Sequence, residues 1–316
     1  MISPQELQAR ARGLLSFPVT PFTADNNVDV PLYREHVQYM IDAEPGALFA
    51  CGGTGEFFSI DLDEYRVAVR AAVEQSNGKV PIVAGVGYGT KLACGFARVA
   101  EEAGADGIMV MPPYLLVSEQ EGLYQHYRAV AASTRLGVIV YQRDNAIFTP
   151  QTVGRLAEIP NIIGFKDGHG DMERLIRTRL EVGDRLLMLN GMPTAELSAQ
   201  AFYGIGCRTY SSAVFNFVPE IARAFFNAVE SGNDAECTRL LKGFYLPFAE
   251  LRDRVKGYAV SLIKAGLQVR GRPLGGVRPP LLDPHPTQVE ELFEIVEHGL
   301  ACLKEKNTWT THGAAS

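Results

Sequence analysis

Short apolar runs recur along the chain and alternate with stretches of helical periodicity. The stretches between the runs, such as 61–76 and 91–103, place apolar residues at helical spacing. Runs that are apolar almost throughout favour parallel strands in a sheet covered on both faces. Eight strand–helix units with right-handed crossovers therefore predict an α/β fold, a (β/α)8 TIM barrel. The predicted strands are 14–19, 47–50, 81–86, 107–111, 137–141, 162–166, 186–190 and 205–211.

A doubly wound open sheet is the structural alternative. Such a sheet usually has a glycine-rich phosphate loop after its first strand, whereas this chain has Phe17-Pro18-Val19-Thr20-Pro21 there. The pattern therefore favours the barrel.

The chain beyond the eighth strand predicts a helical C-terminal extension. Helices are expected over 219–232, 235–256, 257–266 and 287–304, with an extended proline-rich stretch over 273–286. We divide the chain into a barrel with an N-terminal helix (1–232), a helical extension (233–304) and a polar tail without periodicity (305–316), which we expect to be disordered.

The composition argues against several classes of partner and cofactor. The 316 residues carry a net charge of −6 without a long basic run, which argues against nucleic acid and membrane surfaces. The five cysteines and six histidines show no ligand spacing, so we expect no metal. The chain has no apolar segment of membrane-spanning length and no leader-like N-terminus, so we expect a cytoplasmic protein.

Two polar residues close neighbouring strands of the predicted barrel, at the face where barrel active sites lie. Lys166 ends the sixth strand, where partial desolvation favours the neutral, nucleophilic amine. Tyr141 ends the fifth strand at the same level, where its phenol could carry protons. Taken alone, structural roles are the more common ones: Lys166 would reach solvent or pair with Asp167, and Tyr141 would pack in the core.

Two further strand ends carry possible binding groups. After the second strand, Cys51-Gly52-Gly53-Thr54-Gly55-Glu56 can present converging amides to a carboxylate, or can be a simple tight turn in which Glu56 fixes the loop. The eighth strand ends at Ser211 and Ser212, with Asn216 nearby. These residues could bind substrate or cap the next helix.

Together, the Gly-Gly-Thr-Gly-Glu loop, Tyr141 and the Gly-Phe-Lys-Asp strand end resemble the dihydrodipicolinate synthase / N-acetylneuraminate lyase superfamily over nearly the whole chain. The resemblance implies that Lys166 forms a Schiff base and that Tyr141 shuttles protons. It also implies that Gly53 and Thr54 bind the carboxylate beside the keto group. No external cofactor is then required. The resemblance further suggests a homotetramer built as a dimer of dimers.

The chain departs from two branches of this superfamily. Where the lysine-biosynthesis branch has an arginine after its strand-five tyrosine, this chain has Ala146, and where the sialate branch has two acids, it has Pro193 and Thr194. The segments 141–146 and 164–171 instead resemble a branch that dehydrates and decarboxylates 5-dehydro-4-deoxy-D-glucarate, a small dianionic keto-deoxy-aldarate, to 2,5-dioxopentanoate. Candidates for gripping the far end of that substrate are Arg143, Asn145 and Ser212.

Two alternatives remain open. A 2-keto-3-deoxy sugar-acid aldolase would share Lys166 and Tyr141 but release pyruvate. A non-catalytic barrel that senses a keto acid would bind its ligand without turnover. The residue that acts as the base in the elimination is not assigned.

Overall fold

A computed structural model describes residues 1–309, with side chains up to Lys304. Its eight strands form one parallel sheet in the order β1-β8-β7-β6-β5-β4-β3-β2, and a parallel bridge between Ser16 and Leu48 closes the sheet into a barrel. The predicted TIM barrel is confirmed. The strands are β1 Leu14–Leu15, β2 Leu48–Ala50, β3 Ile82–Val86, β4 Gly107–Val110, β5 Gly137–Gln142, β6 Ile162–Asp167, β7 Leu187–Asn190 and β8 Thr209–Ser211.

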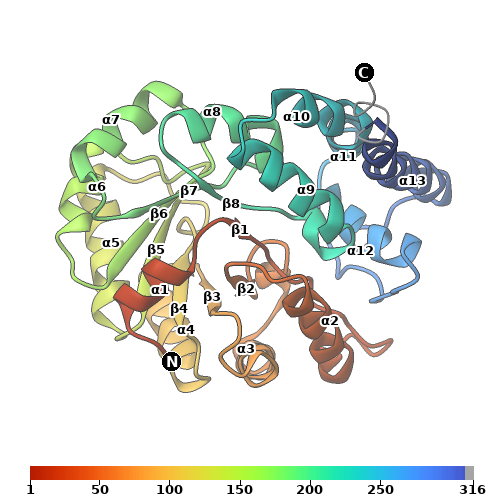
Figure 1. Cartoon of the computed structure of the whole chain (residues 1–316). Helices are drawn as coiled ribbons and strands as arrows, with labels where there is room; N and C mark the ends of the chain where they lie inside the picture. Colours follow the sequence, from red (N-terminus) through yellow and green to blue (C-terminus); the bar gives the residue numbers. More distant parts are fainter. Residues whose placement is uncertain (310–316) are drawn as a thin grey trace.

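Helices cover the outside of this barrel (Figure 1). Several of them begin with a side-chain cap: Asp61 and Glu64, for example, form a reciprocal capping box at the start of α3. The apolar faces of the helices pack against the outer faces of the strands in one large core. The helices of the ring are α2 Val30–Asp42, α3 Leu62–Ser76, α4 Thr90–Glu102, α5 Gln120–Ala132, α6 Pro150–Ala157, α7 Met172–Val182, α8 Ala199–Gly204 and α9 Pro219–Glu230, with short 3-10 turns η1 Phe57–Ser59, η2 Ala195–Ser198 and η3 Val214–Asn216.

A second, smaller core fills the inside of the barrel. It contains Phe49, Ile139 and Leu189 from the strands and Leu7 and Ala11 from the N-terminal segment. The first helix, α1 (Pro4–Arg10), thereby closes the end of the barrel at which the strands begin. Functional side chains are left to the opposite end.

The C-terminal helices lie together on one side of the barrel, where Figure 1 shows them in teal and blue. A π-helical turn, η4 (Leu241–Tyr245), joins α10 (Asp234–Leu240) to α11 (Leu246–Asp253). The extension then continues with α12 (Tyr258–Val269) and α13 (Pro286–Trp309).

The predicted boundaries need adjustment at several places. The first strand ends at Leu15 and not at residue 19, and the π-helical turn η4 divides the helix predicted over 235–256. The eighth strand begins at Thr209 and not at residue 205, because α8 runs to Gly204 and Gly206 turns the chain with a φ of 88°. The last helix continues to Trp309, and the rest of the predicted disordered tail, 310–316, lies outside the described residues. The domain boundary at 232, which falls between α9 and α10, stays a prediction. No helix in the described part of the chain is long and apolar enough to span a membrane.

Candidate active site

Lys166 and Tyr141 are direct neighbours on two adjacent strands of the barrel. They are register partners on β6 and β5, and the Lys166 Nζ atom lies 3.7 Å from the centre of the Tyr141 ring. Only 4% of Lys166 is exposed. The parallel register therefore brings together the two residues that were predicted from separate strand ends.

The combined effect of burial and neighbouring charges lowers the pKa values of both groups. Burial lowers the pKa of Lys166, the Tyr141 phenol opposes this shift, and Arg143 adds to it. Burial alone would raise the pKa of Tyr141, but the positive charges of Lys166 and Arg143 outweigh it and lower the pKa. The amine loses its proton more readily than a free lysine, and the phenol is a stronger acid than a free tyrosine.

Gly191, directly after β7, completes the wall around this pair. The Tyr141 hydroxyl donates to the Gly191 carbonyl at 3.0 Å, and the Arg143 Nη1 atom lies 3.5 Å from the same hydroxyl. A Cβ atom on residue 191 would lie 2.8 Å from the Lys166 Nζ atom. Only glycine leaves room for the reactive amine here, a requirement that the sequence analysis missed.

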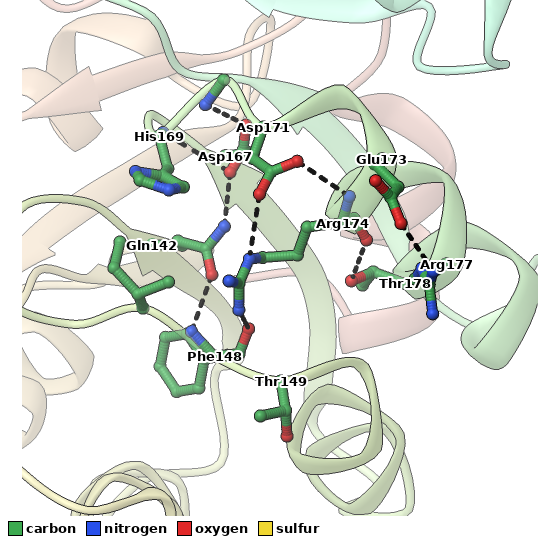
Figure 2. Close-up of polar contacts among 12 residues, drawn as sticks. Gln142, Phe148, Thr149, Asp167, His169, Asp171, Glu173, Arg174, Arg177 and Thr178 are labelled. Atoms are coloured by element: carbon green, nitrogen blue, oxygen red, sulfur yellow. Dashed lines mark hydrogen bonds and ion pairs between the residues drawn. The ribbon is translucent and has the colours of Figure 1, made fainter.

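The strand end behind Lys166 is fixed by a network of hydrogen bonds (Figure 2). The Gln142 side chain donates to Asp167 at 2.5 Å and accepts from the Phe148 amide at 2.8 Å. The Gly170 amide donates to the other Asp167 oxygen at 2.9 Å. Asp167 is thus engaged by β5 and by its own loop, and its negative charge opposes the lowering of the Lys166 pKa.

The Gly53–Thr54 loop is tightly wound and buttressed from outside the barrel. Cys51 and Glu56 both have left-handed φ angles, of 51° and 57°. The Glu56 carboxylate forms a fully buried ion pair with Lys264 of α12 at 2.7 Å and accepts from the Arg278 amide at 3.0 Å. Glu56 fixes the loop to the C-terminal extension, the role expected of it from the sequence.

A cavity of about 500 Å³ opens above Lys166. The strand ends, the 112–115 loop, α11 and α12 all contribute to its wall. Six of the seven predicted site residues line it: Lys166, Tyr141, Gly53, Thr54, Arg143 and Asn145. The structure therefore collects almost the whole predicted set around one space of substrate size.

Ser212 is the predicted residue that does not line the cavity. Its neighbour Ser211 does, while Ser212 is fully buried and interacts with Glu196. Burial raises the pKa of Glu196 to about 7, against the opposing effects of Ser212 and of the Arg252 charge. A buried polar group thus lies just behind the wall of the site.

Two other candidates make structural contacts. The Asn145 amide donates to the carbonyls of Pro113 and Leu116, so it holds the 112–117 loop while also facing the cavity. Asn216 is buried and bonds the backbone of Phe17 and Val19. Asn216 therefore anchors the loop after β1.

Arg252 lines the cavity but was not predicted. It lies near the end of α11 in the C-terminal extension, far in sequence from any strand end. Its guanidinium donates to the Thr194 hydroxyl, directly beyond the cavity-lining Pro193. A search confined to strand ends could not find it.

The described residues contain no group of three or more His, Cys, Asp or Glu side chains arranged to hold a metal ion. The site's reactive groups are an amine, a phenol and guanidinium groups. This donor set suits covalent imine chemistry.

Comparison with known proteins gives one family. The dihydrodipicolinate synthetase family model matches residues 10–299. A probable 5-dehydro-4-deoxyglucarate dehydratase from Streptomyces griseus is 53% identical over 308 residues, covering 95% of this chain and 96% of the relative. A protein of the same description from Rhizobium rhizogenes is 50% identical over 298 residues, covering 94% of this chain and 98% of the relative.

Solved structures show the same fold. Dihydrodipicolinate synthase from Bacillus clausii superposes with a TM-score of 0.85 at 25% identity, covering 92% of this chain and 98% of the other. A prophage protein of the dihydrodipicolinic acid synthase family from E. coli K12, in complex with pyruvate, gives a TM-score of 0.82 at 25% identity, with the same coverages of 92% and 98%.

Proposed function

The chain belongs to the dihydrodipicolinate synthetase family, and on that premise we propose that it converts 5-dehydro-4-deoxy-D-glucarate to 2,5-dioxopentanoate, water and CO2 through an imine on Lys166. The observation that carries the mechanism is the buried Lys166 amine in contact with Tyr141 at the floor of the cavity. The identity of the substrate is inferred from the dehydratase relatives, which are about 50% identical to this chain over nearly its full length.

The reaction begins at the keto carbon. The neutral Lys166 amine adds to it, and the Tyr141 phenol protonates the carbinolamine oxygen, which leaves as water to give the iminium. Gly53 and Thr54 hold the carboxylate beside that carbon, and Glu56 together with Lys264 keeps their loop in place.

The iminium then serves as the electron sink for two eliminations. Loss of a proton from the adjacent methylene and departure of the next hydroxyl as water give a conjugated iminium. The distal carboxylate leaves as CO2, its bonding electrons pass into the conjugated system, and protonation followed by hydrolysis releases the semialdehyde and free Lys166. The net change is one substrate to one 2,5-dioxopentanoate, one water and one CO2.

Product analysis tests this proposal. With 5-dehydro-4-deoxy-D-glucarate, in buffer containing EDTA, CO2 and 2,5-dioxopentanoate should form in equal amounts, and borohydride should trap the substrate carbon skeleton on Lys166. Lys166→Ala should abolish both results, whereas Lys242→Ala, outside the cavity, should not. Accumulation of pyruvate without CO2 would instead identify an aldolase, and binding without any product would identify a sensor.

We also propose a homotetramer built from two dimers in the cytoplasm. The run Tyr114–Val117 beside the cavity supports subunit contact, because four consecutive apolar side chains are exposed there. The five cysteines are all free, which suits a reducing compartment. Light scattering on the purified protein should give four times the mass of the chain.

A further inference from the structure

The second carboxylate of the proposed substrate needs a cationic side chain in the site. The substrate carries a carboxylate at each end, and the Gly53–Thr54 loop serves only the end beside the keto group. A carboxylate held in a largely apolar cavity is stable only when it is paired. The inference below rests on the proposed function and identifies the group that receives the distal end.

Three cationic side chains line the cavity in the described part of the chain: Lys166, Arg143 and Arg252. Lys166 reacts as the neutral amine and is not available as a fixed cation. Arg143 is committed to the reacting end, because its guanidinium lies 3.5 Å from the Tyr141 hydroxyl. Arg252 is the cation that remains.

The Arg252 guanidinium is held in place before any ligand arrives. Its Nε and Nη2 atoms donate to the two Asp253 oxygens at 2.8 and 2.9 Å, and its Nη1 atom donates to Thr194. Only 13% of the side chain is exposed. A guanidinium has more N–H donors than these contacts use, so donors remain for a ligand.

The surroundings of Arg252 strengthen such a contact. Phe248, Val260 and Ile263 from the C-terminal helices line the same cavity as Arg252. Their apolar side chains leave few polar groups in the wall to hold water. A charge pair gains strength as water is removed around it. A preorganised guanidinium loses little side-chain entropy on binding.

We propose that Arg252 binds the distal carboxylate of the substrate and so makes the enzyme selective for dicarboxylic keto acids. Arg252 acts as a specificity-determining residue contributed by the C-terminal extension. The imine chemistry at Lys166 does not require it.

A matched pair of ligands isolates this contact. 2-Oxoadipate has the six-carbon skeleton and both carboxylates of the substrate but no hydroxyl to eliminate, and 2-oxohexanoate replaces its distal carboxylate with a methyl group. The concentration dependence of borohydride trapping on Lys166 is measured for both ligands. The unmodified enzyme should prefer 2-oxoadipate, and Arg252→Gln should reduce that preference about 10- to 100-fold, because a hydrogen-bonded charge pair is lost. Trapping of 2-oxohexanoate should be unchanged.

Two further variants set the limits. Arg252→Lys keeps the charge without the fork and should retain part of the preference, which also shows that the site is folded. Arg254→Gln, two positions along and paired with Glu291, should behave like the unmodified enzyme.

Three results would overturn the inference: equal loss for both ligands in Arg252→Gln, no loss for either, or a selective loss in Arg143→Gln in place of Arg252→Gln. Failure of both ligands to trap Lys166 in the unmodified enzyme would instead refute the proposed function itself.

Discussion

Lys166 and Tyr141 titrate together because they are in contact and share the charge of Arg143. Arg143 lowers the pKa of both groups, so Arg143→Gln should raise both. Since the amine must be neutral to attack, the rise of kcat/KM with pH should move to higher pH in this variant. The measurement is a pH–rate profile, with Arg155→Gln at the exposed Glu121 pair as control. An unchanged profile would remove Arg143 from the electrostatics of the site.

The phenol of Tyr141 can be tested without changing its packing. Tyr141→Phe removes the hydroxyl that contacts Gly191 and should lower kcat by about 10²–10⁴-fold, the usual contribution of general acid–base catalysis. KM should change much less, because the ring still fills its place. Tyr124→Phe, where the ring stacks on Arg155 outside the cavity, is the matched control. A normal kcat in Tyr141→Phe would make the residue a packing residue.

Single positions differed in how far the sequence could predict them. Lys166 and Tyr141 were predicted from the joint motif of the superfamily, because each strand-end residue taken alone fits a structural role. Ser212 was predicted where its neighbour Ser211 lines the cavity, because consecutive residues at a strand end point to opposite sides and the sequence does not show which side faces the cavity. Gly191 carried no signal at all, since only the three-dimensional approach of Lys166 shows why it lacks a side chain.

Secondary structure elements were predicted well where they are regular. Apolar runs located all eight strands, and the family and activity predicted from strand-end motifs are confirmed by the relatives. The pattern failed at 205–208, because Ile205 and Cys207 are apolar for packing reasons while Gly206 turns the chain. The part that α11 and α12 take in the cavity was also hidden, because helix periodicity does not indicate what a helix packs against.

The contact between α12 and the Gly53–Thr54 loop can be measured through the Glu56–Lys264 pair. Lys264→Met should lower the free energy of unfolding by about 3–5 kcal/mol, because it leaves a buried carboxylate unpaired. Adding Glu56→Gln should recover part of this loss. Urea unfolding measures both variants, and Arg254→Met at the exposed Glu291 pair should cost far less. Equal costs for the two methionine variants would show that the buried pair has no special weight.

The stability of the whole molecule should depend on pH through Glu196, which is 2% exposed. Its pKa is raised from 4.5 to about 7 in the folded protein, so folding binds its proton more tightly than the unfolded chain does. Stability from this group is therefore full below about pH 4.5 and is lost as the pH rises through 7, by roughly 3 kcal/mol in total.

Glu196→Gln removes that dependence. The difference in free energy of unfolding between the variant and the unmodified protein should favour the variant more near pH 8 than near pH 5. Urea unfolding at both pH values measures this difference. The exposed Glu35→Gln should show no such difference. A pH-independent offset in Glu196→Gln would mean that the carboxyl does not change its charge in this range.

The closed lower end of the barrel sets the order of events in a catalytic cycle. With Leu7 and Ala11 filling that end, substrate, water, CO2 and semialdehyde share the mouth above Lys166 in the described structure. Because substrate and product use the same opening, a new substrate binds only after 2,5-dioxopentanoate has dissociated. CO2 is small enough to leave first. 2,5-Dioxopentanoate should accordingly be a competitive inhibitor. The rate of turnover would then fall whenever the enzyme that consumes this product is slower and the product accumulates.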